Sequence, residues 1–272
     1  MHPTFSVVIP CLNEEKFLPH LLTSLFQQSV KDFEVVVVDG SSSDKTVEIA
    51  RSFETKLPNL QVVVSEKASL PLQRNIGARK TKGTWLVFVD ADSVLLPYFI
   101  ERLNYFINEQ KPKLFTTWFR PDSEISGDAL FTLVANLFIE GADVFHRPIA
   151  PGPLAVVTRE VYDLVHGYDE TLTFGEDYDF TQRIVSRGIS LQILRETLYV
   201  YSLRRLRKEG TLRFVQLYAK ASLLILLTKR NLRNVPDYMM GGHLYGIKRK
   251  KMKQSVLRQF ESRVKAFIKE LF

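Results

Sequence analysis

The stretch Thr84-Trp-Leu-Val-Phe-Val-Asp-Ala-Asp92 (TWLVFVDAD) is an apolar run that ends in two carboxylates. Its continuous apolar character is typical of a buried strand in a parallel sheet. In open α/β sheets, ligands bind at the carboxyl ends of the strands. Asp90 and Asp92 are two positions apart, so we expect them to share one face of an extended backbone. Such oxygen ligands suit Mg²⁺ or Mn²⁺, which would hold a substrate diphosphate, although an isolated Asp-x-Asp is also a common turn.

The regions around this segment alternate between strand and helix patterns. Residues 5–10 and 33–40 are β-branched runs closed by Pro10 and by Asp39-Gly40, which is typical of buried parallel strands. Residues 15–28 place Leu and Phe at helical spacing between them. By the same criteria we expect helices at 46–53, 98–108, 126–145 and 176–187, and strands at 60–65, 114–119 and 154–158. This alternation predicts an α/β fold with a mainly parallel sheet flanked by helices.

The composition is that of a globular protein with one large domain, or with one domain and an appendage. The chain has 272 residues, of which 45% are hydrophobic, enough for a full core. Cys11 is the single cysteine, which excludes an internal disulfide framework and a cysteine zinc site and fits a reducing compartment. We see no signal-peptide pattern before the first strand. We therefore expect a cytoplasmic protein.

The charge is distributed unevenly along the chain. The net charge is +7, but residues 204–272 carry about 18 Lys and Arg against about 4 Asp and Glu, and the preceding part is acidic. We therefore predict two regions: residues 1–203 as a catalytic domain and residues 204–272 as a basic, helical C-terminal tail. Such a tail favours an anionic partner, which could be nucleic acid, a substrate phosphate or a cytoplasmic membrane face.

Two further strand ends carry polar groups. Pro10-Cys-Leu-Asn-Glu14 ends the first strand, and Asp39-Gly-Ser-Ser-Ser-Asp-Lys-Thr46 ends the second and precedes a helix. The position of ligand sites in α/β sheets favours a binding role for both, with Asp39 accepting from a nucleobase imide or a ribose hydroxyl. The alternative is a pair of plain turns, in which Asp44 caps the helix and Glu14 is a first-turn acid.

The motif Arg74-Asn-Ile-Gly77 lies shortly before the Asp-Ala-Asp strand. Its guanidinium could pair with a diphosphate, and Gly77 would allow close backbone approach. The alternative is an exposed helix arginine, because arginines are mostly solvated.

A second acidic cluster closes the segment Gly167-Tyr-Asp-Glu-Thr-Leu-Thr-Phe-Gly-Glu-Asp177, which opens a helix. A helix N-terminus favours an ionised carboxylate, so Asp177 suits a base that takes a proton from an attacking hydroxyl. Glu176 could orient that hydroxyl. The alternative is that both residues only cap the helix.

In this order along one α/β chain, these motifs resemble those of the family 2 glycosyltransferases, which have the GT-A fold. The resemblance runs from about Phe5 to Gly188. It implies an inverting transfer of a sugar, of the hexosyltransferase type, with Asp177 as the catalytic base. It also implies that Asp92, together with Asp90, holds Mg²⁺ or Mn²⁺. The donor-binding set implied in the same way is Pro10, Asn13, Glu14, Asp39, Arg74, Asp90 and Ala91. In that set Asp39 would contact the base and Asp90 the ribose.

One position departs from the family pattern. Many relatives place a histidine after the last core strand as a metal or phosphate contact, whereas the segment from Tyr199 to Arg207 has none. Metal binding would then depend on Asp92, the diphosphate and water. We expect phosphate or acceptor contacts instead from Glu176, Arg204, Arg205 and Arg207. The alternative for the three arginines is a solvated basic loop.

The rest of the tail contains two patterned segments. Residues 212–227 are apolar except for Arg213, Gln216, Lys220 and Ser222, which is too interrupted for a membrane span. Residues 252–272 follow a basic run and predict a basic amphipathic helix. That helix could bind an anionic membrane peripherally, dock on its own domain or contact a partner in a homodimer.

The function expected from these features is sugar transfer from a UDP- or GDP-sugar to a saccharide or a lipid-linked acceptor. One alternative is a sugar-1-phosphate nucleotidyltransferase, but that class needs a Gly-rich phosphate loop after its first strand, and residues 10–14 are not one. The other is a non-catalytic membrane- or RNA-binding protein on a transferase scaffold. No RNA-binding motif with interleaved aromatics is present, so we expect no nucleic-acid partner.

Overall fold

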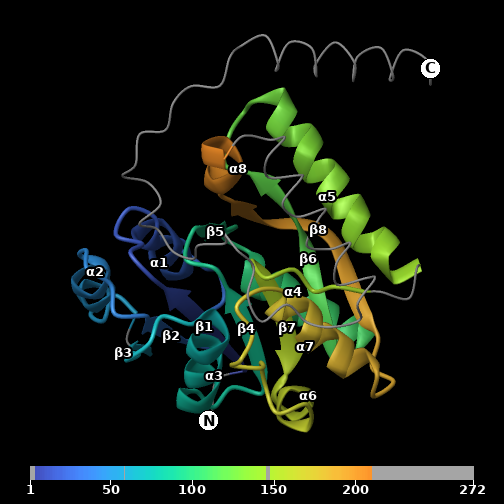
Figure 1. Ribbon diagram of the computed structural model, residues 1–272, viewed down its shortest axis with the longest axis horizontal. Coiled ribbons are helices and arrows are strands. Elements are labelled where there is room, and N and C mark those ends of the chain that lie inside the picture. Colours follow the sequence, from blue (N-terminus) through green and yellow to red (C-terminus); the bar gives the residue numbers. More distant parts are fainter. Residues whose placement is uncertain (1–3, 58, 145–147, 210–272) are drawn as a thin grey trace. The chain divides into compact units, whose positions relative to one another are not determined.

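The computed structural model describes residues 4–57, 59–144 and 148–209 (Figure 1). The chain divides into two compact units, residues 1–242 and 243–272, and all described residues belong to the first. The helices expected within 212–227 and 252–272 lie outside the described residues. Their existence, and the predicted domain boundary between residues 203 and 204, therefore stay predictions.

The described residues form an eight-stranded sheet in the order β3-β2-β1-β4-β7-β6-β8-β5. The strands are β1 Phe5–Cys11, β2 Phe33–Asp39, β3 Leu60–Val64, β4 Trp85–Val89, β5 Ser93–Leu95, β6 Leu114–Pro121, β7 Leu154–Thr158 and β8 Leu191–Tyr201. Strands β1 to β4 run parallel to one another, and β6 runs parallel to β8. Strand β7 is antiparallel to its neighbours β4 and β6, and strand β5 is antiparallel to its neighbour β8. The predicted α/β fold with a mainly parallel sheet is confirmed.

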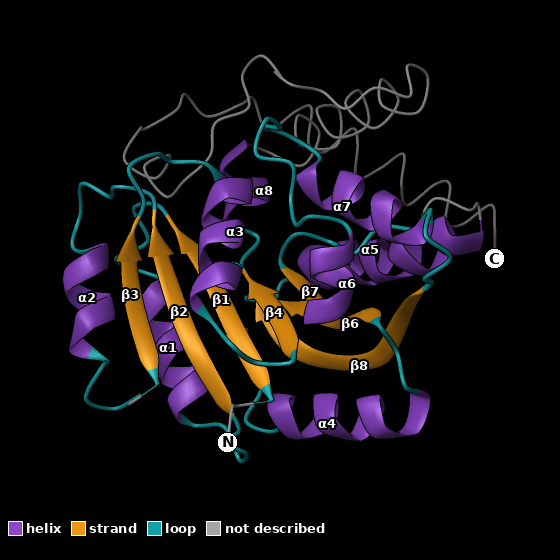
Figure 2. Cartoon of the chain, turned by 90° about the horizontal axis from the view of Figure 1, so that it is seen from below, coloured by secondary structure: helices purple, strands orange, loops and turns teal. Residues whose placement is uncertain are grey.

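Helices cover both faces of this sheet (Figure 2). They are α1 Leu18–Phe26, α2 Thr46–Ser52, α3 Leu70–Lys80, α4 Phe99–Gln110, α5 Ser126–Val144, α6 Arg159–Leu164, α7 Glu176–Val185 and α8 Arg204–Glu209. Side chains alternate along β1, so Val7 and Ile9 join the core under α1 and α4, and Val8 joins the core under α3, α6 and α7. Among the described helices, none combines the length and apolarity needed to cross a membrane.

Helices α1 and α3 differ from the sequence prediction, α1 in its first residue and α3 in its presence. Helix α1 begins at Leu18, so Pro19 falls in its first turn, where proline is tolerated. Helix α3 was not among the expected helices. It lacks an apolar stripe because three of its buried side chains, Gln73, Arg74 and Asn75, are polar.

Gly77 brings α3 close to the sheet. A Cβ atom on Gly77 would lie 2.3 Å from Cγ1 of Val8 and 3.2 Å from Cγ1 of Val36. The close approach that we expected at this glycine is therefore made by two strands of the chain's own sheet, β1 and β2. Its consequence is to set the position of Arg74, three residues earlier on the same helix.

Candidate active site

The polar strand ends identified from the sequence meet at one edge of the sheet. Strands β1, β2 and β4 are parallel neighbours, and Cys11 at the end of β1 pairs with Asp39 at the end of β2. Their carboxyl ends point the same way (Figure 2). Glu14, Asp39 and Asp90 follow or end these strands, so they lie at the same edge of the sheet.

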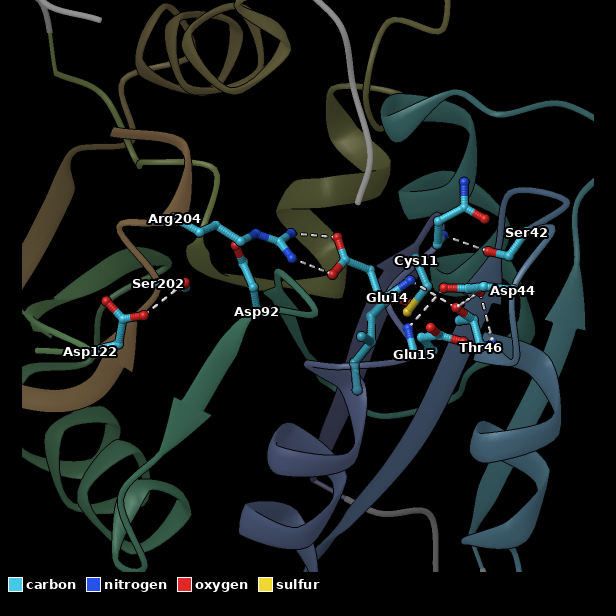
Figure 3. Close-up of polar contacts among 12 residues, drawn as sticks. Cys11, Glu14, Glu15, Ser42, Asp44, Thr46, Asp92, Asp122, Ser202 and Arg204 are labelled. Carbon is cyan, nitrogen blue, oxygen red and sulfur yellow. Dashed lines mark hydrogen bonds and ion pairs between the residues drawn. The ribbon is translucent and has the colours of Figure 1, made fainter. Parts of the chain in front are cut away.

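The loops after β1 and β2 interlock through hydrogen bonds (Figure 3). The Asn13 amide N–H donates to Ser42 Oγ at 2.7 Å, and Asn13 Oδ1 accepts from the Ser43 amide at 2.8 Å. Asp39 is fully buried, and its Oδ2 accepts from the Ser42 amide at 2.8 Å. Asn13 has a φ of 55°, a left-handed conformation that asparagine tolerates. Asn13 and Asp39 are thus fixed in one pair of loops, next to the buried Pro10 of β1.

Asp44 holds the start of α2 without acting as its N-cap. The N-cap residue is Lys45, which makes no side-chain capping bond. Asp44 Oδ1 accepts instead from the Thr46 amide at 3.0 Å, and its Oδ2 accepts from the Glu15 amide at 3.1 Å. The carboxylate therefore ties the two loops together, as the close-up shows (Figure 3).

Arg74 is a buried ionic link rather than a solvated helix arginine. Its side chain is 1% exposed, and Nη2 donates to Asp90 Oδ1 at 3.2 Å and to the Gly152 carbonyl at 2.9 Å. Nη1 donates to Glu176 Oε1 at 3.1 Å. The guanidinium also lies over the ring of Tyr168, 5.1 Å from its centroid. Arg74 thereby joins the end of β4 to the beginning of α7.

Asp90 and Asp92 lie in a turn, so the expected extended backbone is wrong. Strand β4 ends at Val89, and the Ser93 amide donates to the Asp90 carbonyl at 3.1 Å, with Ala91 buried inside the turn. The two carboxylates pair with different arginines, Asp90 with Arg74 and Asp92 with Arg204. Burial raises the pKa of each to about 6, although its arginine acts in the opposite direction.

Arg204, the first residue of α8, links the loop after β1 to the turn after β4. Its Nη1 donates to Glu14 Oε2 at 2.6 Å, and its Nε lies 2.8 Å from Asp92 Oδ2 (Figure 3). The guanidinium stacks 4.3 Å from the centroid of the Phe17 ring. The pKa of Glu14 is raised, because the effect of burial exceeds the opposing effect of the hydrogen bond and charge of Arg204. Arg204 therefore lies among the carboxylates, not in a solvated loop.

The other two arginines of the segment have different surroundings. Arg205 lies close enough to Asp92 for its charge to lower the pKa of that carboxylate. Arg207 turns away and pairs with Asp122, at the end of β6, and with Asp128 of α5, at 2.5 and 3.1 Å. Of the three predicted phosphate contacts, the structure brings Arg204 and Arg205 to the site and uses Arg207 to fasten α8.

Glu176 and Asp177 begin α7, directly after Gly175 in its left-handed conformation with φ 71°. Glu176 is buried against Arg74, and burial with the neighbouring Asp177 raises its pKa. Asp177 is only partly buried; its Oδ2 accepts from the Gly152 amide at 3.0 Å and its Oδ1 from the Tyr178 amide at 2.8 Å. The structure thus gives Glu176 an ion pair and leaves Asp177 the more accessible carboxylate.

Asp92 is the carboxylate of this site that could hold a divalent cation beside a substrate diphosphate. Within the described part of the chain, no cluster of three or more His, Cys, Asp or Glu side chains could hold a metal. Mg²⁺ commonly uses one or two carboxylates, with phosphates and waters as its other ligands. Asp92 fits that role, provided that Arg204 leaves its Oδ2.

Two residues of the site were missed in the sequence. Gln73 Nε2 donates to the carbonyls of Cys11 and Val38 at 2.8 and 2.7 Å, holding α3 to the ends of β1 and β2. Gly152 contacts both Arg74 and Asp177 through its backbone. Both contacts use backbone atoms of Gly152, so no side-chain pattern in the sequence could predict them. Gln73 is adjacent to the Arg74 motif, and that adjacency was the only hint.

Solved structures share this architecture. Residues 1–349 of S. aureus TarS in complex with UDP-GlcNAc match with a TM-score of 0.61 and 26% identity over 74% of this chain and 59% of that one. A mannosyltransferase from Pyrobaculum calidifontis, in complex with GDP-Man and Mn²⁺, matches in fold with a TM-score of 0.61 and 21% identity, covering 82% of this chain and 65% of that one. The fold is therefore of the GT-A class.

Sequence comparison identifies the family to which the chain belongs. The profile described as Glycosyl transferase family 2 matches residues 6–162, and the chain belongs to this family. An uncharacterized glycosyltransferase of Haemophilus influenzae is 28% identical over 66% of this chain, which spans 61% of that protein's length. The poly(ribitol-phosphate) beta-N-acetylglucosaminyltransferase TarS of Staphylococcus aureus is 37% identical over 74% of this chain and 36% of its own length.

Proposed function

We propose that this protein is an inverting glycosyltransferase that moves a sugar from a nucleotide-diphosphate sugar to an acceptor hydroxyl. The observation that carries the proposal is the buried Arg74, which contacts Asp90 at the proposed donor side and Glu176 beside Asp177 at the proposed acceptor side. One guanidinium thus holds the two halves of a transfer site in fixed relation. Family membership and the UDP-GlcNAc complex of TarS support the same reaction.

The reaction is a direct displacement at the anomeric carbon. The acceptor hydroxyl attacks that carbon while Asp177 takes its proton, and the bond to the diphosphate breaks with its electron pair on the diphosphate oxygen. Asp177 lies in the first turn of α7, at the proposed acceptor side. The Gly152 and Tyr178 amides orient the carboxylate.

Arg204 stabilises the leaving diphosphate. Its guanidinium already lies beside Asp92, where a cation-bound diphosphate would be placed, and arginine forms charge-assisted bonds to phosphate oxygens. A divalent cation held by Asp92 would neutralise the charge that develops on the leaving group. The Mn²⁺ in the mannosyltransferase complex supports this part of the proposal.

The donor is a UDP- or GDP-sugar, since the two ligand-bound relatives hold UDP-GlcNAc and GDP-Man. We further propose that the acceptor is a saccharide or a lipid-linked saccharide, and that the protein is cytoplasmic and peripheral on the membrane. The basic composition of residues 204–272 supports the membrane location. A homodimer is the other arrangement that the amphipathic pattern at 252–272 favours.

A donor panel tests the proposed reaction. Thermal unfolding of the full chain is recorded with UDP, GDP, UDP-sugars and GDP-sugars in the presence of Mn²⁺, because a bound ligand raises stability with its concentration. The expected result is stabilisation by one nucleoside diphosphate and its sugar, followed by release of that diphosphate when a suitable saccharide is added. Stabilisation by sugar-1-phosphates and nucleoside triphosphates instead would indicate a nucleotidyltransferase. No stabilisation by any nucleotide would overturn the proposal.

A further inference from the structure

Helix α5 carries three polar side chains inward, together with the core residue Ile139, and five large apolar side chains outward. Asp128, Thr132 and Asn136 are at most 9% exposed. The outward residues are Leu130, Leu133, Val134, Leu137 and Phe138, each at least 49% exposed, and we refer to them as the outer α5 face. This is the reverse of the usual arrangement in a surface helix.

Hydrogen bonds fix α5 in this orientation. Asn136 accepts from the Phe119 amide at 3.3 Å and donates to the Phe119 carbonyl at 2.9 Å. Glu140 accepts from Trp118 Nε1 at 2.9 Å. These partners lie at the irregular part of β6, where its register against β8 shifts. Because β6 presents polar groups there, α5 cannot rotate to bury its leucines without leaving buried polar groups unsatisfied.

Exposed apolar patches of this kind mark interaction surfaces. An anionic membrane fits poorly, because the 19 residues of α5 contain no Lys or Arg, whereas interfacial helices are rich in them. The acidic side chains Asp128 and Glu140 of this helix are paired with Arg207 and Arg195. The outer α5 face is therefore apolar and favours an apolar occupant from the protein itself.

The residues that follow α8 in the sequence offer such an occupant. Helix α8 is fastened beside the first turns of α5 by the pair Arg207–Asp128 and ends at Glu209. The apolar segment 212–227 begins three residues later. At helical spacing its polar residues Arg213, Gln216 and Lys220 form one stripe, which leaves an apolar face on the opposite side.

We infer that the outer α5 face is the docking surface for residues 212–227 of the same chain. The apolar face of the segment covers the leucines of α5, and the stripe of Arg213, Gln216 and Lys220 faces away. Docking there also holds α8, and with it Arg204, at the carboxylates. The inference does not depend on the proposed sugar transfer.

Engineered cysteine pairs in the full chain test this contact. The single natural cysteine, Cys11, is 2% exposed and does not interfere. Leu133→Cys is combined with Tyr218→Cys on the apolar face of the segment, and in a matched control with Lys220→Cys on the stripe. Leu137→Cys with Ile225→Cys gives a second apolar pair. After mild oxidation, we expect an intrachain disulfide in the apolar pairs and none in the control, by non-reducing electrophoresis and peptide mass.

Three results overturn the inference. These are the absence of an intrachain disulfide in both apolar pairs, equal yields in the apolar pairs and the control, and disulfides between two chains, which would make the face an interface between copies.

A charge on the outer α5 face gives an independent readout. Leu133→Glu is compared with Tyr105→Glu on α4, a residue that is 55% exposed. Both sites are exposed, so both variants should fold, and thermal unfolding checks this. We expect faster tryptic cleavage at Lys220 in Leu133→Glu only. Unchanged cleavage overturns the inference, and unchanged cleavage with lost liposome binding would assign the face to lipid.

Discussion

Each carboxylate after β4 has its own arginine, and this pairing shapes the chemistry of the site. Asp90 is held by a buried arginine from α3, whereas Asp92 is held by the first residue of α8. Breaking a buried ion pair is costly, so Arg74 has a structural role that cannot be exchanged easily. The pair of Asp92 with Arg204 is the one that a bound diphosphate would rearrange in the proposed reaction.

The first residue-scale prediction concerns Asp177. Replacing Asp177 by Asn should leave donor binding unchanged and lower kcat about 10²-fold or more, because a positioned general base is lost. Donor affinity is measured by calorimetry and turnover by diphosphate release. The matched control is Asp163→Asn, an exposed carboxylate on α6, which should behave as wild type. Near-normal turnover of Asp177→Asn would mean that another residue is the base.

A second prediction follows from the contact between Arg204 and Asp92. In Arg204→Gln, Mn²⁺ should bind more tightly than in wild type when no nucleotide is present, because the guanidinium no longer competes for Asp92 Oδ2. With Mn²⁺ present, the nucleoside diphosphate should bind more weakly, since a phosphate contact is lost. Free Mn²⁺ is followed by electron paramagnetic resonance. The control is Arg195→Gln on β8, which removes an exposed arginine that pairs with Glu140 of α5. Equal Mn²⁺ affinity in Arg204→Gln and wild type would exclude the competition.

The raised pKa of Asp92 gives a third prediction, on pH. A metal binds the ionised carboxylate, and the pKa of Asp92 is raised from 3.8 to about 6. Mn²⁺-dependent diphosphate binding should therefore be constant above pH 7 and weaken about tenfold per unit below about pH 6. Calorimetry from pH 8 to pH 5, with circular dichroism to confirm folding, measures this. Affinity that stays constant down to pH 5 would show that Asp92 is not a metal ligand.

At the scale of elements, helix α3 can pack closely on the sheet because Gly77 has no Cβ atom. Gly77→Ala should destabilise the protein, because overpacking costs about 1–3 kcal/mol and the gain in helix propensity is about 1 kcal/mol. The added Cβ would lie 2.3 Å from Val8. Gly127→Ala on α5, where a Cβ would meet nothing within 4 Å, is the control. The midpoints of urea unfolding decide, and equal midpoints for the two variants would contradict the packing argument.

The sequence predicted the elements that obey a simple period and missed those that do not. Continuous apolar runs such as β2 and β4 were identified because both faces are buried. Helix α3 was missed because its buried face is polar, and the helix expected at 126–145 is present as α5, although three of its buried side chains are polar. The resemblance named Arg74 and Asp177, but their link through Gly152 depends on backbone atoms of a distant loop. No local pattern carries that information.

At the scale of the whole molecule, the charge asymmetry of the sequence has a partial structural counterpart. Helix α8 belongs to the part after residue 203 that was predicted as a tail, yet its arginines contact Glu14, Asp92 and Asp122 of the body. The most basic stretch, Lys248–Lys251 and beyond, lies outside the described residues. Its role in the proposed membrane location therefore needs a direct measurement.

We predict that residues beyond Lys248 bring the protein to anionic membranes, where a lipid-linked acceptor would be found. Each Lys or Arg near such a surface contributes roughly 1 kcal/mol, and the sequence of this segment adds an apolar face for insertion. Flotation with liposomes that contain anionic lipid compares the full chain with a chain ending at Gly246. The full chain should float at low salt, less so at high salt, because charges are screened. Equal flotation of the two chains, or none for either at low salt, would assign the segment to packing or dimerisation and remove the reason to expect a lipid-linked acceptor.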